Sequence, residues 1–180
     1  QNALFWDAAA GGYFGTTGED PTVLLRTKED YDGAEPSVNS VSALNLLRLA
    51  QMTDHPEYAT RAKKTLAAFS RQLTRAPHAM PAMLAALDFQ LGQPMQIVIA
   101  GSPNAADTRT LLREVNARFI PNKVVLLADG AAGQEALARR FEFIASLHPI
   151  DGKAAAYVCE NGACKLPTTD PAKLAALLDG

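Results

Sequence analysis

The stretch that decides the fold is Tyr31-Asp32-Gly33-Ala34-Glu35-Pro36-Ser37-Val38-Asn39-Ser40, which stands directly in front of a long apolar helical pattern. Asp32-Gly33 is typical of a turn and Pro36 stiffens the chain. Ser37 is a residue type that caps a helix, because its hydroxyl accepts a hydrogen bond from one of the first free N–H groups. The stretch therefore predicts a turn that leads into a capped helix.

The same stretch also allows a functional interpretation. Asp32 and Glu35 are close in sequence, and two carboxylates can share acid and base work. Aromatic side chains that could stack on a sugar, or simply form core, are Trp6, Tyr13, Phe14 and Tyr31. From residue chemistry alone we favour the structural interpretation, and a ligand site stays open.

Three helices are predicted downstream, each with apolar side chains at helical spacing. The first begins at Ser37. The second begins at Asp54-His55-Pro56-Glu57, where Pro and an acid fall in the first turn. The third begins near Pro81 and ends at Gly92, and it is apolar nearly all round, so we expect it to be buried. The apolar positions are Val41, Leu44, Leu46, Leu47, Leu49 and Ala50, then Tyr58, Ala62, Leu66, Phe69 and Leu73, then Met83, Leu84, Leu87 and Leu91.

Residues 4–31 indicate a loop-rich approach to this helical part. Gly11-Gly12 before two aromatic residues predicts a tight turn into an extended piece, because Gly reaches positive φ at little cost. Residues 22–26 hold β-branched and apolar side chains and predict a short strand. Together the turn and the strand predict a hairpin-like segment within residues 4–31.

After Gly92-Gln93-Pro94 the pattern changes to strand, helix, strand. Met95–Ala100 and Lys123–Ala128 are apolar, β-branched runs typical of buried parallel strands. Between them Asp107 can cap a helix, and a second helix is expected over about residues 134–146. Such a unit is right-handed. The apolar positions of the connecting helix are Leu111, Leu112, Val115 and Phe119.

The last part predicts a hairpin and a helix. Asn161-Gly162 is a strong two-residue turn signal within residues 155–166, and Thr169-Asp170-Pro171 begins a short helix with Leu174, Leu177 and Leu178. The predicted fold class is mixed α and α/β. Helical hairpins occupy residues 1–93, and a small α/β domain with two parallel strands and a hairpin occupies residues 94–180.

Cys159 and Cys164 flank the predicted turn and face each other one rung beyond it. A non-hydrogen-bonded rung brings Cα atoms to roughly 4.5 Å, near the short end of disulfide geometry. One interpretation is a structural or redox-active disulfide. The other, which we favour, is a pair of reduced thiols packed as small apolar groups in a cytoplasmic protein.

Several function classes are excluded by composition and spacing. Hydrophobic residues make up 48%, charged residues 20%, and the net charge is −2, so neither disorder nor a nucleic-acid partner is indicated. The apolar runs are too short to span a membrane. Gly101-Ser102-Pro103-Asn104 lacks the glycines of a dinucleotide site. The histidines are scattered, so we expect no metal and no cofactor.

The amino-terminal sequence suggests a fragment. Gln1 stands where an initiator Met is expected, no signal-peptide pattern follows, and Leu4-Phe5-Trp6 is typical of packed structure. We therefore expect this chain to have the N-terminal part of its own full-length protein as a partner. We also expect a cytoplasmic location, and self-association of the fragment through exposed apolar surface.

The opening stretch, followed by Ala43-Leu44-Asn45-Leu46-Leu47-Arg48-Leu49, resembles the C-terminal part of the thioredoxin-domain-containing proteins related to spermatogenesis-associated protein 20. The resemblance covers almost the whole chain in order. Further segments that carry it are Phe5-Trp6-Asp7, Gly11-Gly12-Tyr13-Phe14, Ala79-Met80-Pro81, Met83-Leu84, Ile97-Val98-Ile99-Ala100-Gly101, Pro121-Asn122-Lys123-Val124, Tyr157-Val158-Cys159 and Thr169-Asp170-Pro171. Val38 departs from the family, which commonly has Gly at that position.

The resemblance implies an N-terminal thioredoxin-like domain followed by an (α/α)6 toroid similar to those of N-acylglucosamine 2-epimerases and six-hairpin glycosidases. This chain would supply the last hairpins of the toroid. The paired histidines expected of the epimerases have no counterpart here. The residues that the resemblance places toward the toroid cleft are Trp6, Tyr13, Asp32, Glu35, Ser37 and Asn39.

Two functions follow from the resemblance. The first is a carbohydrate-type module that binds a sugar-like small molecule and has no turnover on its own. The second is a structural or protein-interaction scaffold for a redox domain missing from this chain. Carboxylates exposed in a concave site near Trp6 and Tyr13 favour the first function. Carboxylates taken up by backbone N–H groups and salt bridges favour the second.

Overall fold

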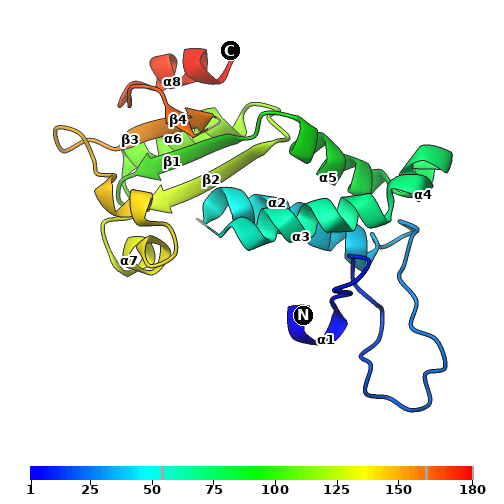
Figure 1. The fold of residues 1–180 in the computed structure, drawn as a ribbon. Coiled ribbons are helices and arrows are strands. Elements are labelled where there is room, and N and C mark those ends of the chain that lie inside the picture. The colour runs from blue at the N-terminus through cyan, green and yellow to red at the C-terminus, as the bar shows by residue number, and fades with distance from the viewer. Residues whose placement is uncertain (54, 161, 180) are drawn as a thin grey trace. The chain divides into compact units, whose positions relative to one another are not determined.

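The computed structural model describes residues 1–53, 55–160 and 162–179, and the chain forms two compact units (Figure 1). Unit 1 comprises Gln1–Ala50 and His55–Gly92, and unit 2 comprises Gln51–Asp54 and Gln93–Gly180. The predicted capping role of Asp54 and the predicted turn position of Asn161 lie outside the described residues.

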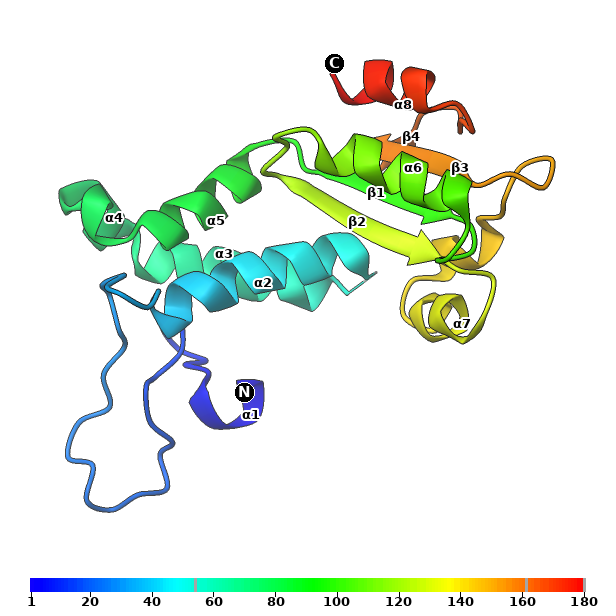
Figure 2. The same ribbon diagram turned by 180° about the vertical axis from the view of Figure 1, so that it is seen from behind.

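Unit 1 is helical. The three predicted helices are present, and in the second the chain leaves helical geometry at Phe69, whose φ is −101° and ψ is 5°. Within the unit, α2 and α3 lie side by side in both views (Figures 1 and 2). The elements are α1 (Asn2–Phe5), α2 (Val38–Met52), α3 (Pro56–Ala68), α4 (Ser70–Arg75), the 3₁₀ helix η1 (Pro77–Ala79) and α5 (Pro81–Leu91).

The prediction that the third helix is buried all round is wrong for this chain. One side of α5 is buried through Met83, Ala86 and Phe89, and this helix contacts α3. Leu91 is 77% exposed, and Leu84 and Leu87 are half-buried. The reason is that the helices of unit 1 cover only one side of α5, so the rest of its apolar surface faces outward.

The amino-terminal segment forms the predicted tight turn. Gly11 and Gly12 have φ of 75° and 79°, and the turn brings Trp6 and Tyr13 together as an isolated antiparallel bridge. The strand predicted over residues 22–26 is absent. Leu24 and Leu25 are 98% and 77% exposed, and without a neighbouring strand to complete a hydrogen-bonded ladder, β-propensity alone does not form a strand.

Unit 2 is built on a four-stranded sheet in the order β2-β1-β3-β4. Strands β1 (Met95–Ala100) and β2 (Lys123–Ala128) are parallel, as predicted, and β3 (Ala155–Glu160) runs antiparallel to β1. Helix α6 (Ala106–Asn116) connects β1 to β2, and β4 (Ala163–Cys164) leads to α8 (Pro171–Leu178). Asp170 caps α8 by accepting a hydrogen bond from Ala172 N–H at 2.8 Å.

Each face of the sheet has its own core, as side-chain alternation along a strand requires. Ile97 and Ile99 pack with residues of α6 and α8, including Leu111 and Leu174. Val98 and Ala100 pack on the opposite side, against Ile144 and Leu147. The sheet is therefore covered by helices on both faces.

Three predictions in this unit are wrong in detail. Asp107 does not cap α6, because the helix begins at Ala106 and has no side-chain cap; the Asp107 carboxylate instead accepts a hydrogen bond from Ala154 N–H at 2.8 Å. Phe119 is 94% exposed, because α6 ends at Asn116 and the phenyl group lies beyond the helical stripe. The helix expected over residues 134–146 is two elements, α7 (Ala132–Ala138) and the 3₁₀ helix η2 (Glu142–Ser146). The Gln134 amide donates to the carbonyls of Ile144 and Leu147 at 2.7 and 3.0 Å, which holds the chain in a bend.

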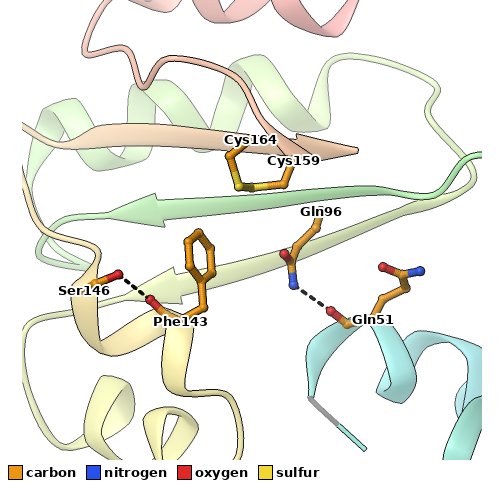
Figure 3. Close-up of a disulfide and its surroundings, with 6 residues drawn as sticks. All are labelled: Gln51, Gln96, Phe143, Ser146, Cys159 and Cys164. Carbon is orange, nitrogen blue, oxygen red and sulfur yellow. Dashed lines mark hydrogen bonds between the residues drawn. A yellow bond between two sulfur atoms is a disulfide. The ribbon is translucent and has the colours of Figure 1, made fainter. Parts of the chain in front are cut away.

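The hairpin has the predicted register, with Cys159 opposite Cys164 and Glu160 opposite Ala163. The structure joins the two cysteine sulfurs in a disulfide with Cα atoms 3.9 Å apart (Figure 3), whereas the sequence interpretation favours reduced thiols. Cys159 is buried and Cys164 is exposed.

No helix in the described residues is both long and apolar enough to cross a membrane.

The redox state of the pair in solution can be measured directly. We expect no reactive thiol before reduction of the unfolded chain and two after it. A disulfide that closes so short a loop contributes about 2 kcal/mol to the free energy of unfolding, so a reducing agent should lower the stability of unit 2 by about that amount. The double variant Cys159→Ala/Cys164→Ala is the control, because its stability should not respond to the reducing agent. Two reactive thiols in the untreated protein would show the pair to be reduced.

Candidate functional site

Asp32 holds the beginnings of two helices that are distant in sequence. One carboxylate oxygen accepts a hydrogen bond from Ser37 N–H at 2.8 Å, directly before α2. The other accepts from Ala82 N–H at 2.8 Å and from Met83 N–H at 3.4 Å, in the first turn of α5. Asp32 N–H also donates to Ala79 O at 2.8 Å. The carboxylate thus replaces the missing side-chain cap of α5.

The electrostatics of Asp32 match this structural role. Its side chain is buried, and burial by itself raises the pKa of a carboxyl group. Hydrogen bonds from Ser37 N–H, the Ser40 hydroxyl and the N–H groups of α5 outweigh that effect, so the pKa of Asp32 lies below its ordinary value. A carboxylate held ionised in this way is poorly suited to donate a proton near neutral pH.

Asn39 is fully buried and binds the backbone of the amino-terminal turn. Its side-chain oxygen accepts from Tyr13 N–H at 2.6 Å, and its amide donates to Tyr13 O at 3.0 Å. The Tyr13 hydroxyl donates to the side-chain oxygen of Asn2 at 2.8 Å, and its ring meets Trp6 edge to face, with centroids 5.1 Å apart. Asn39 therefore fixes the position of the aromatic pair.

The remaining two predicted site residues of the stretch differ in exposure. Ser37 is buried, and its hydroxyl oxygen accepts a hydrogen bond from Ser40 N–H at 3.1 Å, which confirms the predicted cap of α2. Glu35 is exposed, and its carboxylate has no hydrogen bond or ion pair within the described parts of the chain. Asp32, Ser37 and Asn39 have their polar groups committed to holding unit 1 together.

Trp6, one of the predicted site residues, lines a cavity formed by described residues. This cavity has a volume of about 360 Å³ and lies against α3. Within it the Arg61 guanidinium lies 5.6 Å from the Trp6 ring centroid and 3.7 Å from the Glu57 carboxylate. The lining residues are Trp6, Ala8, Pro56, Glu57, Thr60, Arg61 and Lys64.

Sequence reasoning missed the basic residues of this cavity. Lys64 is exposed and Arg61 is half-buried at the edge of the apolar stripe of α3, and basic residues at such positions indicate only a solvated helix face. The signal that could have found them is their i, i+3 spacing, together with a turn that must pack on this helix. Gly11 provides that contact, since a Cβ at its position would lie 2.6 Å from Lys64 O.

The same turn is held by an ion pair. Lys28 Nζ lies 2.8 Å from the Asp7 carboxylate, which also accepts hydrogen bonds from Ala9 and Ala10 N–H at 2.9 and 3.0 Å. The hydrogen bond from Lys28, followed by the one from Ala10 N–H, lowers the pKa of Asp7 to about 2. The turn that carries Trp6 therefore depends on an ionised Asp7.

The surroundings of the disulfide differ from those that lower the pKa of a thiol. Cys159 and Cys164 occupy neighbouring strands of unit 2, whereas low thiol pKa values arise at helix N-termini or beside cations. The nearest cation in sequence, Lys165, forms an ion pair with Glu160 at 3.6 Å. The pair thus has the surroundings of a structural crosslink.

Within the described residues no group of three His, Cys, Asp or Glu side chains is placed to hold a metal ion.

Comparisons with known proteins find relatives that match almost the whole chain over part of their own length. The chain is 47% identical over 179 residues to spermatogenesis-associated protein 20 of Rattus norvegicus and of Homo sapiens, which covers 99% of this chain and 23% of each relative. An uncharacterised protein of Caenorhabditis elegans is 30% identical over 164 residues, covering 91% of this chain and 22% of that protein. No family model and no solved structure matches.

These similarities relate the chain to the spermatogenesis-associated protein 20 family. The chain spans about a quarter of the length of the relatives that it matches.

Replacing Asp32 tests its structural role. Asp32→Asn keeps the shape but turns an amide N–H₂ toward backbone donors and removes charge-assisted hydrogen bonds, each of which contributes about 1.5–3 kcal/mol. We expect the free energy of unfolding of unit 1 to fall by about 3 kcal/mol in chemical denaturation. Glu35→Gln is the matched control and should change stability by less than about 0.5 kcal/mol. Equal effects of the two substitutions would contradict the assignment.

The Asp7 ion pair predicts a pH dependence. Because the folded-state pKa of Asp7 is lowered from 3.8 to about 2, its contribution is complete above the unfolded-state value and is lost as pH falls from about 4 toward 2. Asp7→Asn should therefore be less stable than the parent at pH 7, and the difference should shrink over that window. Denaturation midpoints measured from pH 7 to pH 2 give the comparison. Asp30→Asn, which removes an exposed carboxylate elsewhere in the amino-terminal segment, is the control variant for the same measurement.

Proposed function

We propose that this chain is the non-catalytic, ligand-binding part of a carbohydrate-type helical toroid, and that its ligand is a sugar-like small molecule. The observation that carries the proposal is the Trp6 cavity, where an aromatic ring, a hydroxyl and charged groups meet. Aromatic faces pack on the C–H faces of sugar rings, and the polar groups around them supply hydrogen bonds to hydroxyls.

The arrangement of the carboxylates argues against turnover, and the commitment of Asp32 to backbone N–H groups by itself favours a scaffold. Acid–base catalysis by two carboxyl groups requires both to reach the substrate from one site. The Asp32 oxygens are occupied by backbone N–H groups, and Glu35 stands exposed outside the residues that line the cavity. We therefore expect no sugar turnover by the isolated chain.

A second candidate function is a structural or interaction scaffold, and the outer surface of α2 favours it. Val38, Val41 and Leu49 are 44%, 42% and 40% exposed, and their spacing places them on one side of the helix. Further helices of a longer protein, as the toroid resemblance implies, would cover this side, and in the isolated chain the same side would favour self-association. Val38 is exposed at the helix start, so its bulk is accommodated there.

A thermal-shift screen of neutral and charged monosaccharides on the full-length protein tests the ligand proposal. A ligand at ten times its dissociation constant adds about 1.4 kcal/mol, which corresponds to a rise of about 3 °C in Tm. We expect such a rise for at least one sugar, and its loss in Trp6→Leu. Asp32→Ala should lower the starting Tm yet retain the shift. A screen without any shift would favour the scaffold, and turnover of a sugar by the 180-residue chain would contradict the non-catalytic assignment.

A further inference from the structure

The residues that line the cavity at Trp6 have a net positive charge, and this charge limits which ligands the cavity can bind. It lies on one face of α3, where residues three and four positions apart are neighbours. Arg61 and Lys64 contribute two positive charges and Glu57 one negative charge, so the lining bears a net charge of about +1 at neutral pH.

The positive charges are only weakly balanced within the chain. The Glu57–Arg61 contact is 3.7 Å long and the Glu57 side chain is 79% exposed, and pairs of this kind contribute little. Lys64 is exposed and forms no ion pair with any residue that the structure describes. Lys28, the other cation near the turn, is committed to Asp7 at 2.8 Å. An arriving anion would therefore meet Lys64 without a competing ion pair among the described residues, and Arg61 with only the long contact to Glu57.

The shape of Arg61 suits a planar or tetrahedral anion. Its guanidinium carbon lies 5.6 Å from the Trp6 ring centroid, and a guanidinium presents its N–H donors along a planar edge. Such an edge binds a carboxylate or phosphate through two parallel hydrogen bonds. The Thr60 hydroxyl donates to Pro56 O at 3.1 Å, and its oxygen still has a lone pair that can accept a hydrogen bond from a ligand hydroxyl.

The size of the cavity limits the ligand. A volume of about 360 Å³ lies at the lower end of the range for small-molecule sites, which fits one sugar ring and its substituents. The close contact between Gly11 and Lys64 O fixes the turn against the helix, so this wall of the cavity is formed before a ligand binds.

We propose that the cavity formed by Trp6, Arg61 and Lys64 selects a single hydroxylated ring that carries an anionic group, a carboxylate or a phosphate. The inference rests on the ligand-binding function proposed above and adds the charge of the ligand. The ring packs near Trp6, and its anion lies between the guanidinium and the ammonium group.

Trp6 is the single tryptophan of the chain, so its emission reports directly on this cavity. The 180-residue chain is titrated with glucose, glucuronate, glucose 6-phosphate and inorganic phosphate at fixed ionic strength. We expect at least one of the two anionic sugars to bind about tenfold more tightly than glucose. Because loss of one charge-assisted hydrogen bond costs about 1.5 kcal/mol, Arg61→Met and Lys64→Met should each weaken binding of that sugar about tenfold. Lys63→Met, an exposed neighbour on the same helix outside the lining, should bind like the parent.

The outcomes separate the two proposals. Equal binding of glucose and both anionic sugars would overturn the selection for an anion and leave sugar binding in place. Inorganic phosphate that binds as tightly as glucose 6-phosphate would overturn recognition of the ring. An unchanged emission with every compound, in a protein whose Tm shows it to be folded, would overturn both proposals. Preference for glucuronate or for glucose 6-phosphate identifies which anion the site takes.

Discussion

The structure of unit 1 depends on one buried carboxylate that serves two helices. The N–H groups of a first helical turn lack partners within their own helix, and the dipoles of that turn favour a negative charge. Asp32 meets both needs at once, for the start of α2 through Ser37 and for the start of α5 through Ala82 and Met83. A single ionised group therefore fixes where two helices begin, although Asp32 and Ala82 are 50 residues apart along the chain.

This double role explains why the sequence alone leaves Asp32 open to two interpretations. Its contact with Ser37 is local and predictable from the turn and cap pattern. Its contact with α5 is not, because nothing in the pattern of residues 31–40 indicates which distant N–H groups will reach the carboxylate. An ionised side chain next to Glu35 suggests catalysis until both of its oxygens are seen to be occupied.

The same distinction separates the correct predictions from the wrong ones. Strands β1 and β2, the register of Cys159 with Cys164, and the Ser37 cap of α2 follow from local patterns of apolar residues, turns and caps. The strand over residues 22–26 and the burial of α5 required neighbours that the described part of the chain does not supply. The inward position of Phe119 required α6 to continue beyond Asn116. At the candidate site Trp6 could be predicted from its chemistry, whereas Arg61 and Lys64 depended on where the Gly11 turn packs.

The stretch from Tyr31 to Ser40 thus affects the candidate ligand site indirectly, by holding the residues that form it in position. Asn39 holds both backbone groups of Tyr13, Tyr13 packs against Trp6, and Trp6 forms a wall of the cavity. Gly12 makes this path possible, since a Cβ at its position would lie 3.0 Å from the Asn39 oxygen. A polar side chain that pairs with backbone in this way has little rotational freedom left, so the aromatic wall is held in place before any ligand binds. Of the two carboxylates that first suggest a catalytic pair, Asp32 fixes the start of α2, the helix that carries Asn39, whereas Glu35 is exposed and takes no part in this path.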